Sequence, residues 1–274
     1  MLGSKSITAL ILVMATSAVA APAKQKEKLI DPVAIDALDT MGAFLREQES
    51  FDVHVVAETD YVLGNGQKVR RSAYGTVRVR KPDHLRAEIR SDRRDRQFFY
   101  DGETFTIYSP RMGFYATSPA TGTIRELADQ LQTKYGLELP LVDLFRWGTD
   151  EDSAKEITQA TYVGPAVVDG VQTDQYAFRQ PGLDWQIWID QGERPVPRKL
   201  VLTTTDVPAR PERAVELTWN LATHPDDKVF AFTPPKDAQR IPLAEIAPTK
   251  RTHPAHPARQ HLDSTQQRAK SARK

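Results

Sequence analysis

Few residues in this 274-residue chain have the types and spacing that catalysis requires. His54, His84 and His224 lie far apart in the central region, and none belongs to the HExxH pattern that binds zinc. The chain also lacks the G-x-S-x-G turn that presents a nucleophilic serine, and any glycine-rich phosphate loop. Because it contains no cysteine, thiol catalysis and cysteine-based metal sites are excluded. We therefore expect no enzyme activity, no cofactor and no metal; the alternative is a hydrolase whose site is assembled from separated residues.

Basic residues provide the binding chemistry that the sequence does offer, and one group of them is compact. It comprises Arg90, Arg93, Arg94 and Arg96. These guanidinium groups could contact acidic lipid headgroups or phosphate. Asp92 and Asp95 are interleaved with them, however, and mixed charge of this kind favours a solvated turn at the tip of a hairpin, running from Arg90 to Arg96.

The second basic group is the tail, residues 247–274. It holds seven Lys or Arg residues against one Asp, so the rest of the chain is acidic although the formal net charge is +1. An acidic body is a poor partner for nucleic acid, whose phosphates attract cations. The tail has too few apolar residues to fold, so we expect it to be disordered. Its His253, His256 and His261 could hold a metal weakly, and its cations could contact an anionic membrane; a solvated tail is favoured.

Residues 1–20 have the plan of a secretory signal peptide. Lys5 precedes an apolar run from Ile7 to Val19, and Ala18-Val19-Ala20 forms an A-x-A cleavage site. The run is shorter than the ~20 residues that span a bilayer, so the mature protein should have no membrane span. We expect cleavage after Ala20, with Ala23 as second choice, and release into the periplasm. Without cysteine, the mature protein cannot be lipidated.

The helices and strands that position these side chains are predicted from the spacing of apolar residues, which is helical in some segments and alternating in others. After a short mature N-terminal segment, residues 21–30, Asp31-Pro32 predicts the start of a helix that ends near Glu49. Alternating strands follow between residues 51 and 116, and Asn65-Gly66 predicts a hairpin turn. Two helices, residues 123–135 and 140–148, separate them from a second group of strands between residues 157 and 221.

These patterns predict a single, mainly β domain of the α+β class, residues 31–246. Sequential strands joined by short turns imply one antiparallel sheet of roughly ten strands, and a sheet this wide curls. We expect an incomplete β-barrel with the helices packed on its concave face. The apolar side chains expected to line the enclosed space are Leu127, Leu131, Leu144, Phe145, Trp185, Ile187, Leu217 and Trp219. Whether they border a ligand cavity or fill a core stays open.

Five stretches resemble an uncharacterised family of predicted periplasmic proteins. They are Asp31-Pro32-x-Ala34-Ile35, Tyr100-Asp101-Gly102-x-Thr104, Tyr135-Gly136-x-x-Leu139-Pro140-Leu141, Asp184-Trp185-Gln186-Ile187-Trp188-Ile189 and Phe232-Thr233-Pro234-Pro235. The resemblance covers about residues 31–241, and the family in turn resembles the LolA/LolB lipoprotein carriers. It implies an incomplete β-barrel closed by helices around an apolar cavity, which in the carriers shields acyl chains from water. It implies no catalytic residue.

We therefore expect an exported periplasmic protein that binds a lipid, or the acyl chain of a lipoprotein, in an apolar cavity. The alternative on the same scaffold is an envelope sensor or interaction module that binds a partner protein. The first predicts a hydrophobic ligand, and the second predicts a stoichiometric protein partner.

Overall fold

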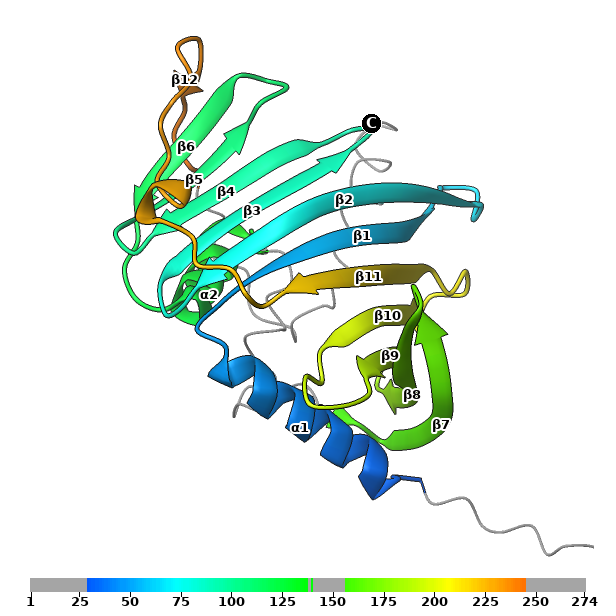
Figure 1. Cartoon of the computed structure of the whole chain (residues 1–274). Coiled ribbons are helices and arrows are strands. Elements are labelled where there is room, and N and C mark those ends of the chain that lie inside the picture. Colours follow the sequence, from blue (N-terminus) through cyan, green and yellow to red (C-terminus); the bar gives the residue numbers. More distant parts are fainter. Residues whose placement is uncertain (1–28, 138, 140–155, 245–274) are drawn as a thin grey trace, which may run out of the picture.

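A computed structural model of the chain describes residues 29–137, 139 and 156–244. They form one twelve-stranded sheet in the order β12-β6-β5-β4-β3-β2-β1-β11-β10-β9-β8-β7. The sheet curls, most tightly over β7 to β10, and two helices lie on its concave side (Figure 1). The expected curled sheet with helices on its concave face is therefore confirmed. We call the concave side the inner face and the opposite side the outer face.

Helix α1, Pro32–Glu47, begins as its sequence predicts and ends about two residues earlier. The Asp31 side chain accepts a hydrogen bond from the Val33 amide at 3.1 Å, and Pro32 occupies the first turn, where its missing N–H is not needed. One side of the helix is buried, and it consists of Ala34, Leu38, Met41, Gly42 and Leu45.

The first six strands form the expected meander of neighbours. They are β1 Ser50–Val62, β2 Lys68–Arg80, β3 His84–Ser91, β4 Asp95–Asp101, β5 Thr104–Ser109 and β6 Phe114–Pro119. The turn at Asn65-Gly66 joins β1 to β2, and Gly66 adopts a φ of 84°, which glycine accepts without strain. The expected turn is shorter than Arg90 to Arg96, because only residues 92–94 lie between β3 and β4. Arg90 is paired in β3 and Arg96 in β4, because Asp95 opposite Arg90 continues the ladder.

Helix α2, Ile124–Tyr135, crosses the inner face of this meander. Thr123 and Glu126 form a reciprocal capping box at its start, and Gly136, with a φ of 62°, ends it in the left-handed region. The prediction of residues 123–135 as a helix is thus confirmed. The second predicted helix, residues 140–148, lies outside the described residues.

The second strand group follows α2 and rejoins the first. It comprises β7 Gln159–Val168, β8 Val171–Gln180, β9 Leu183–Asp190, β10 Pro197–Thr204 and β11 Glu212–Asn220. Because β11 pairs with β1, the two groups share one sheet.

The chain then returns over the outer face through the 3-10 turn η3, Asp227–Val229, to β12, Gln239–Arg240, which pairs with β6 in parallel. Phe232 anchors this return by packing its ring 5.1 to 5.4 Å from those of Phe99, Tyr108 and Tyr115. The two-residue strand β12 was not expected, because its pairing depends on this distant aromatic contact rather than on any local pattern.

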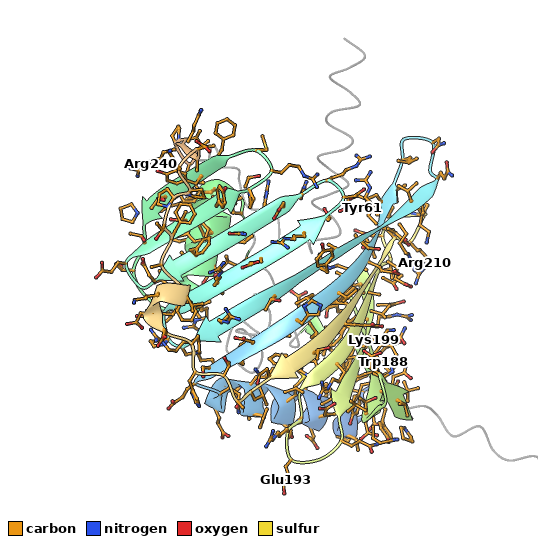
Figure 2. The ribbon with its side chains drawn as sticks, turned by 45° about the horizontal axis from the view of Figure 1, so that its top comes forward. Tyr61, Trp188, Glu193, Lys199, Arg210 and Arg240 are labelled. Atoms are coloured by element: carbon orange, nitrogen blue, oxygen red, sulfur yellow. The ribbon has the colours of Figure 1, made fainter. Side chains whose placement is uncertain are left out.

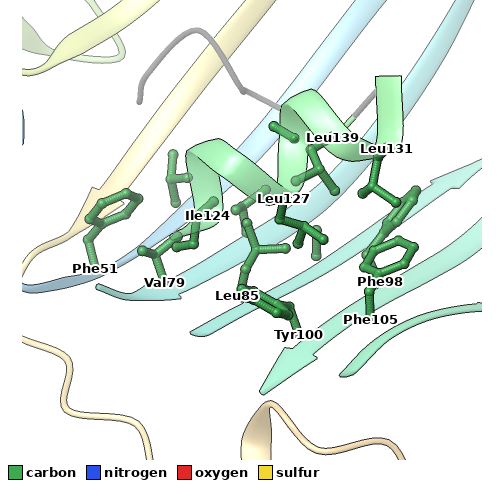
Figure 3. Packing of buried hydrophobic residues seen from close by; sticks show 14 of the residues in the cluster. Phe51, Val79, Leu85, Phe98, Tyr100, Phe105, Ile124, Leu127, Leu131 and Leu139 are labelled. Atoms are coloured by element: carbon green, nitrogen blue, oxygen red, sulfur yellow. The ribbon is translucent and has the colours of Figure 1, made fainter. Parts of the chain in front are cut away.

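Two apolar clusters lie on the inner face, one beneath each helix. The α2 cluster contains Ile124, Leu127 and Leu131 packed on β1 to β5 and β11 (Figure 3). The α1 cluster contains Leu38, Met41 and Leu45 packed on β7 to β9. Each helix therefore covers its own half of the sheet.

Candidate functional site

The inner face can be followed along the ladder, because residues directly opposite each other in neighbouring strands share a face. On β1 the odd-numbered residues from Phe51 to Tyr61 face inward. The register extends this set to odd-numbered residues of β2, β3 and β11 and to even-numbered residues of β4. In these strands, all of them described by the structure, the inward positions are uncharged except for arginines.

The eight side chains expected to line the interior do not form one group. Leu127, Leu131 and Leu217 belong to the α2 cluster and are at most 3% exposed. Trp185 and Ile187 belong to the α1 cluster. Of the three other predicted residues, Leu144 and Phe145 lie outside the described residues, so their contribution stays a prediction.

Trp219 lies where the two clusters meet. It is only partly buried and packs against both of them, as do Leu200 and Leu221. Its ring centroid lies 5.3 Å from that of Phe51, and its indole nitrogen donates to the Pro197 carbonyl oxygen at 2.7 Å. The indole is thus held at a fixed orientation while part of its apolar surface remains uncovered.

A small polar patch interrupts the inner face at the far end of the α1 cluster. Leu183 of β9 lies directly opposite Gln180 of β8 on one side and Thr204 of β10 on the other. The Trp185 indole nitrogen donates to Gln180 Oε1 at 3.0 Å, whereas the buried Thr204 hydroxyl has no hydrogen-bond partner among the residues that the structure describes. This hydroxyl is one polar group of the inner face that a further donor or acceptor could satisfy.

The outer face has a different chemistry, because its charges are of both signs and are paired. Arg78 contacts Asp52 at 3.0 Å, and Arg198 contacts Asp190 at 2.7 Å. Trp188 points outward, with Lys199 Nζ 5.9 Å from its ring centroid (Figure 2). These contacts describe a solvated surface stabilised by local ion pairs.

Asp60 is the most deeply buried carboxylate of the outer face, with a side chain only 4% exposed. Burial by itself would raise its pKa. Hydrogen bonds from Arg70 at 2.9 Å and from Lys68, together with the Glu212 amide, outweigh burial and hold the pKa below its ordinary value. This arrangement fastens the end of β1 to β2 and β11 and suggests no catalytic role.

The three histidines that the structure describes do not gather into a site. His54 is exposed on the outer face, and His84 bonds Asp83 at 2.6 Å while its ring packs against Phe230. His224 lines an open pocket of about 510 Å³ beside Arg80 and Lys81. Within the described residues, no group of three or more His, Asp or Glu side chains is arranged to hold a metal ion.

Sequence reasoning did not place any arginine on the inner face. Arg71 and Arg213 both lie opposite Thr59, and Arg96 lies opposite Ile89. The alternation of strand residues could have found Arg71, because Arg71 lies two residues from both Val69 and Ala73 and so shares their face of β2. Arg96 was hidden because it was assigned to a turn.

Several solved structures are similar to this chain at low sequence identity. No curated protein sequence matches significantly. Among solved structures, the Mycobacterium tuberculosis lipoprotein LppX is similar at 16% identity, covering 72% of this chain and all of that one, with a TM-score of 0.47. LprF from Mycobacterium bovis is similar at 12% identity, covering 77% and 100%, with a TM-score of 0.39. A LolA superfamily protein from Nitrosomonas europaea is similar at 12% identity, covering 73% and 97%, with a TM-score of 0.35.

The sequence itself matches a protein family over residues 34–244, most of the chain. That family is DUF2092, described as predicted periplasmic protein, so the resemblance stated from the sequence motifs is confirmed. Neither described helix combines the length and apolar character needed to cross a bilayer. The chain therefore belongs to the DUF2092 family of predicted periplasmic proteins, and its expected periplasmic compartment is confirmed.

Proposed function

We propose that this protein binds the acyl chain of a lipid or a lipoprotein on its inner face, between α1 and α2, and that it acts as a carrier rather than an enzyme. One observation supports this most strongly. The inner face is apolar, yet Leu200, Trp219 and Leu221, which lie between the two helix clusters, are only partly buried. Exposed apolar surface in a concave setting is the usual mark of a hydrophobic ligand site.

In this proposal, the binding free energy comes from transfer of the acyl chain from water to the apolar inner face. Each CH₂ group that moves from water into an apolar environment gains about 0.8 kcal/mol, so a long chain needs few specific contacts. The proposed lining comprises Leu127, Leu131, Leu144, Phe145, Trp185, Ile187, Leu217 and Trp219, with Leu200 and Leu221 added from the structure. Release would require either helix to move from the sheet, or a receptor that binds the chain more tightly.

A fluorescent fatty-acid probe tests the proposal on the purified full chain. Val55 and Val56 are adjacent in β1, but Val55 packs against the α2 cluster while Val56 is 43% exposed on the outer face. Val55→Asn should weaken probe binding about tenfold, the effect of losing ~1.4 kcal/mol of apolar contact, whereas Val56→Asn should leave it unchanged.

A second variant keeps the proposal testable if Val55→Asn does not fold. Leu221 directly follows the last residue of β11. Leu221→Asn should therefore weaken probe binding about as much as Val55→Asn, with less effect on the sheet. If the wild-type chain takes up no probe while crosslinking in the envelope captures one stoichiometric protein, the interaction-module alternative replaces the carrier.

A further inference from the structure

Two neighbouring hairpin ends, residues 90–96 and 109–114, bring arginines together at one end of the sheet. The turns between β3 and β4 and between β5 and β6 lie on the same side, because these four strands are consecutive and antiparallel (Figure 1). We call the two hairpin ends the arginine tip, and its arginines are Arg90, Arg93, Arg94, Arg96 and Arg111. Asp92 and Asp95 are its only carboxylates, so the arginine tip has a net charge of +3.

Hydrogen bonds hold the two turns to each other. The Arg111 guanidinium donates to the carbonyl oxygens of Asp92, at 2.7 Å, and Ser91, at 3.4 Å. Within the first turn, the Ser91 hydroxyl accepts from the amides of Arg93 and Arg94 at 3.3 and 3.0 Å. The backbone of the arginine tip is therefore ordered before any partner arrives, which lowers the entropic cost of binding.

Most charges of the arginine tip are not neutralised within the part of the chain that the structure describes. Of its five arginines, only Arg90 forms an ion pair there, with Glu88 at 3.9 Å and Asp95 at 3.8 Å. The side chains of Arg93 and Arg94 are exposed. A group of cations held close together in this way creates a positive field that attracts anionic surfaces.

Arg96 connects the arginine tip with the inner face. It lies opposite Ile89, on the same face of β4 as Phe98, and its side chain is about half-buried. Burial, and then the nearby charge of Arg94, lower its pKa below the ordinary value. A half-buried guanidinium beside a second cation is costly unless an anion approaches it.

Met112 adds an exposed apolar side chain to these cations. It follows Arg111 in the turn and is 66% exposed, and among the large hydrophobic residues that the structure describes only Leu29 is more exposed. Cations beside an exposed apolar side chain are typical of surfaces that lie on anionic membranes, where the charges meet headgroups and the apolar group enters the interface. The phosphates of a nucleic acid would match the arginines but would leave Met112 in water.

We propose that the arginine tip is a docking surface for an anionic lipid bilayer, with Arg93 and Arg94 on lipid phosphates and Met112 among the headgroups. Guanidinium groups suit phosphate because they donate two parallel hydrogen bonds to its oxygens. The inference goes beyond the proposed acyl binding and does not depend on it. For a carrier, such docking would place one end of the inner face next to the membrane.

Co-sedimentation of the full chain with lipid vesicles tests the docking surface. The chain should bind vesicles made of equal parts of phosphatidylcholine and phosphatidylglycerol more tightly than vesicles of phosphatidylcholine alone, and added salt should reduce the difference. Arg93→Gln with Arg94→Gln should weaken binding to the anionic vesicles about thirtyfold, because each arginine near such a surface contributes roughly a fivefold factor. The basic tail, residues 247–274, is present in every variant, so its own contribution stays constant.

Arg194→Gln with Lys228→Gln provides the matched control, because it removes the same charge elsewhere. Arg194 lies in the loop between β9 and β10, and Lys228 lies in η3; both are exposed at the opposite end of the strands. This control should bind anionic vesicles as the wild type does. Both double variants should unfold at the wild-type temperature, because all four side chains are exposed.

A fluorescent label tests the insertion of Met112. Because the chain contains no cysteine, Met112→Cys supplies a single thiol for a dye whose emission depends on polarity. Its emission should shift to shorter wavelength when anionic vesicles are added. The same dye on Glu193→Cys, at an exposed position in the loop between β9 and β10, should show no shift (Figure 2).

The outcomes distinguish this inference from the proposed function. Equal vesicle binding by the two double variants, or no binding by the wild type, overturns the docking surface. An unshifted dye at position 112 overturns it as well, and so does release of the protein by soluble glycerol phosphate, which would indicate a small-anion site. If docking is observed but the fatty-acid probe does not bind, the acyl-binding proposal fails and the docking surface remains.

Discussion

The ammonium group of Lys81 lies 2.7 Å from the carbonyl oxygen of Leu45, and so joins the turn between β2 and β3 to the C-terminal end of α1. It also donates to the Arg46 carbonyl oxygen at 3.0 Å. The next residue, Pro82, accepts a hydrogen bond from the Ile124 amide at 2.8 Å, where α2 begins. One turn therefore positions both helices that cover the inner face, and through them the proposed site.

Because of Lys81, the free energy of unfolding should change with pH in the alkaline range. Burial, and then the charge of Arg46, lower its pKa from 10.5 to about 8. Between these values the unfolded chain binds a proton that the folded chain does not, so the free energy of unfolding should rise from pH 8 to pH 10.5. With solvent screening at this half-exposed amine, the rise should be about 1–2 kcal/mol relative to Lys81→Met in urea titrations.

Arg46→Gln provides the control for this effect. It removes the neighbouring positive charge, so the rise between pH 8 and pH 10.5 should become smaller. A wild-type curve that runs parallel to that of Lys81→Met over this range would contradict the prediction.

The reciprocal cap of α2 should contribute measurably to stability. The Thr123 hydroxyl accepts from the Glu126 amide at 3.2 Å, while the Glu126 carboxylate accepts from the Thr123 amide at 2.7 Å. Thr123→Ala removes the hydroxyl that accepts from the Glu126 amide, and should lower the free energy of unfolding by about 1 kcal/mol. Thr123→Ser should retain most of the stability, and equal losses in both variants would show that the hydroxyl is not responsible.

A cavity in the α2 cluster should strongly lower the free energy of unfolding. Leu127 is 1% exposed, so Leu127→Ala should lower the free energy of unfolding by about 2–5 kcal/mol, measured by chemical denaturation. Leu29→Ala makes the same chemical change at a residue that is 67% exposed, and should cost less than about 0.5 kcal/mol. Similar values for the two variants would mean that α2 does not pack firmly on the sheet.

Tyr100 should stabilise the fold only while its hydroxyl is protonated. The hydroxyl donates to the Gly122 carbonyl oxygen, and burial, followed by the charges of Asp83 and Asp101, raises its pKa to about 12. Its contribution should be fully present below pH 10 and lost as the pH rises towards 12. Tyr100→Phe should therefore cost about 1 kcal/mol at pH 8, and the difference from wild type should disappear near pH 12. A constant difference across that range would contradict the prediction.

Sequence patterns predicted the helix ends and the turn well, because the residues that determine them are neighbours in the sequence. The Asp31-Pro32 start of α1, the Asn65-Gly66 turn and the Gly136 end of α2 each depend on residues adjacent in sequence. The assignment of Arg96 to a turn failed for the opposite reason. Its strand conformation comes from pairing with Ile89, and charge alone could not reveal that partner.

The candidate site was harder to predict than the fold. Inward-facing strand residues could be chosen from alternation, and Leu217 and Ile187 are indeed buried beneath the helices. Their division into two clusters follows from the order of the strands, which brings β11 against β1 and leaves Trp219 at the boundary. The row Arg71, Thr59 and Arg213 likewise depends on cross-strand register, which is fixed by turns and packing far from those residues.

Native mass spectrometry of the chain purified from the periplasm tests the central claim most directly. If the inner face binds acyl chains, part of the protein should carry additional mass that matches a lipid or an acylated protein, and Val55→Asn should reduce that fraction while Val56→Asn preserves it. Recovery of the bare polypeptide alone, together with no uptake of added phospholipid, would contradict the account.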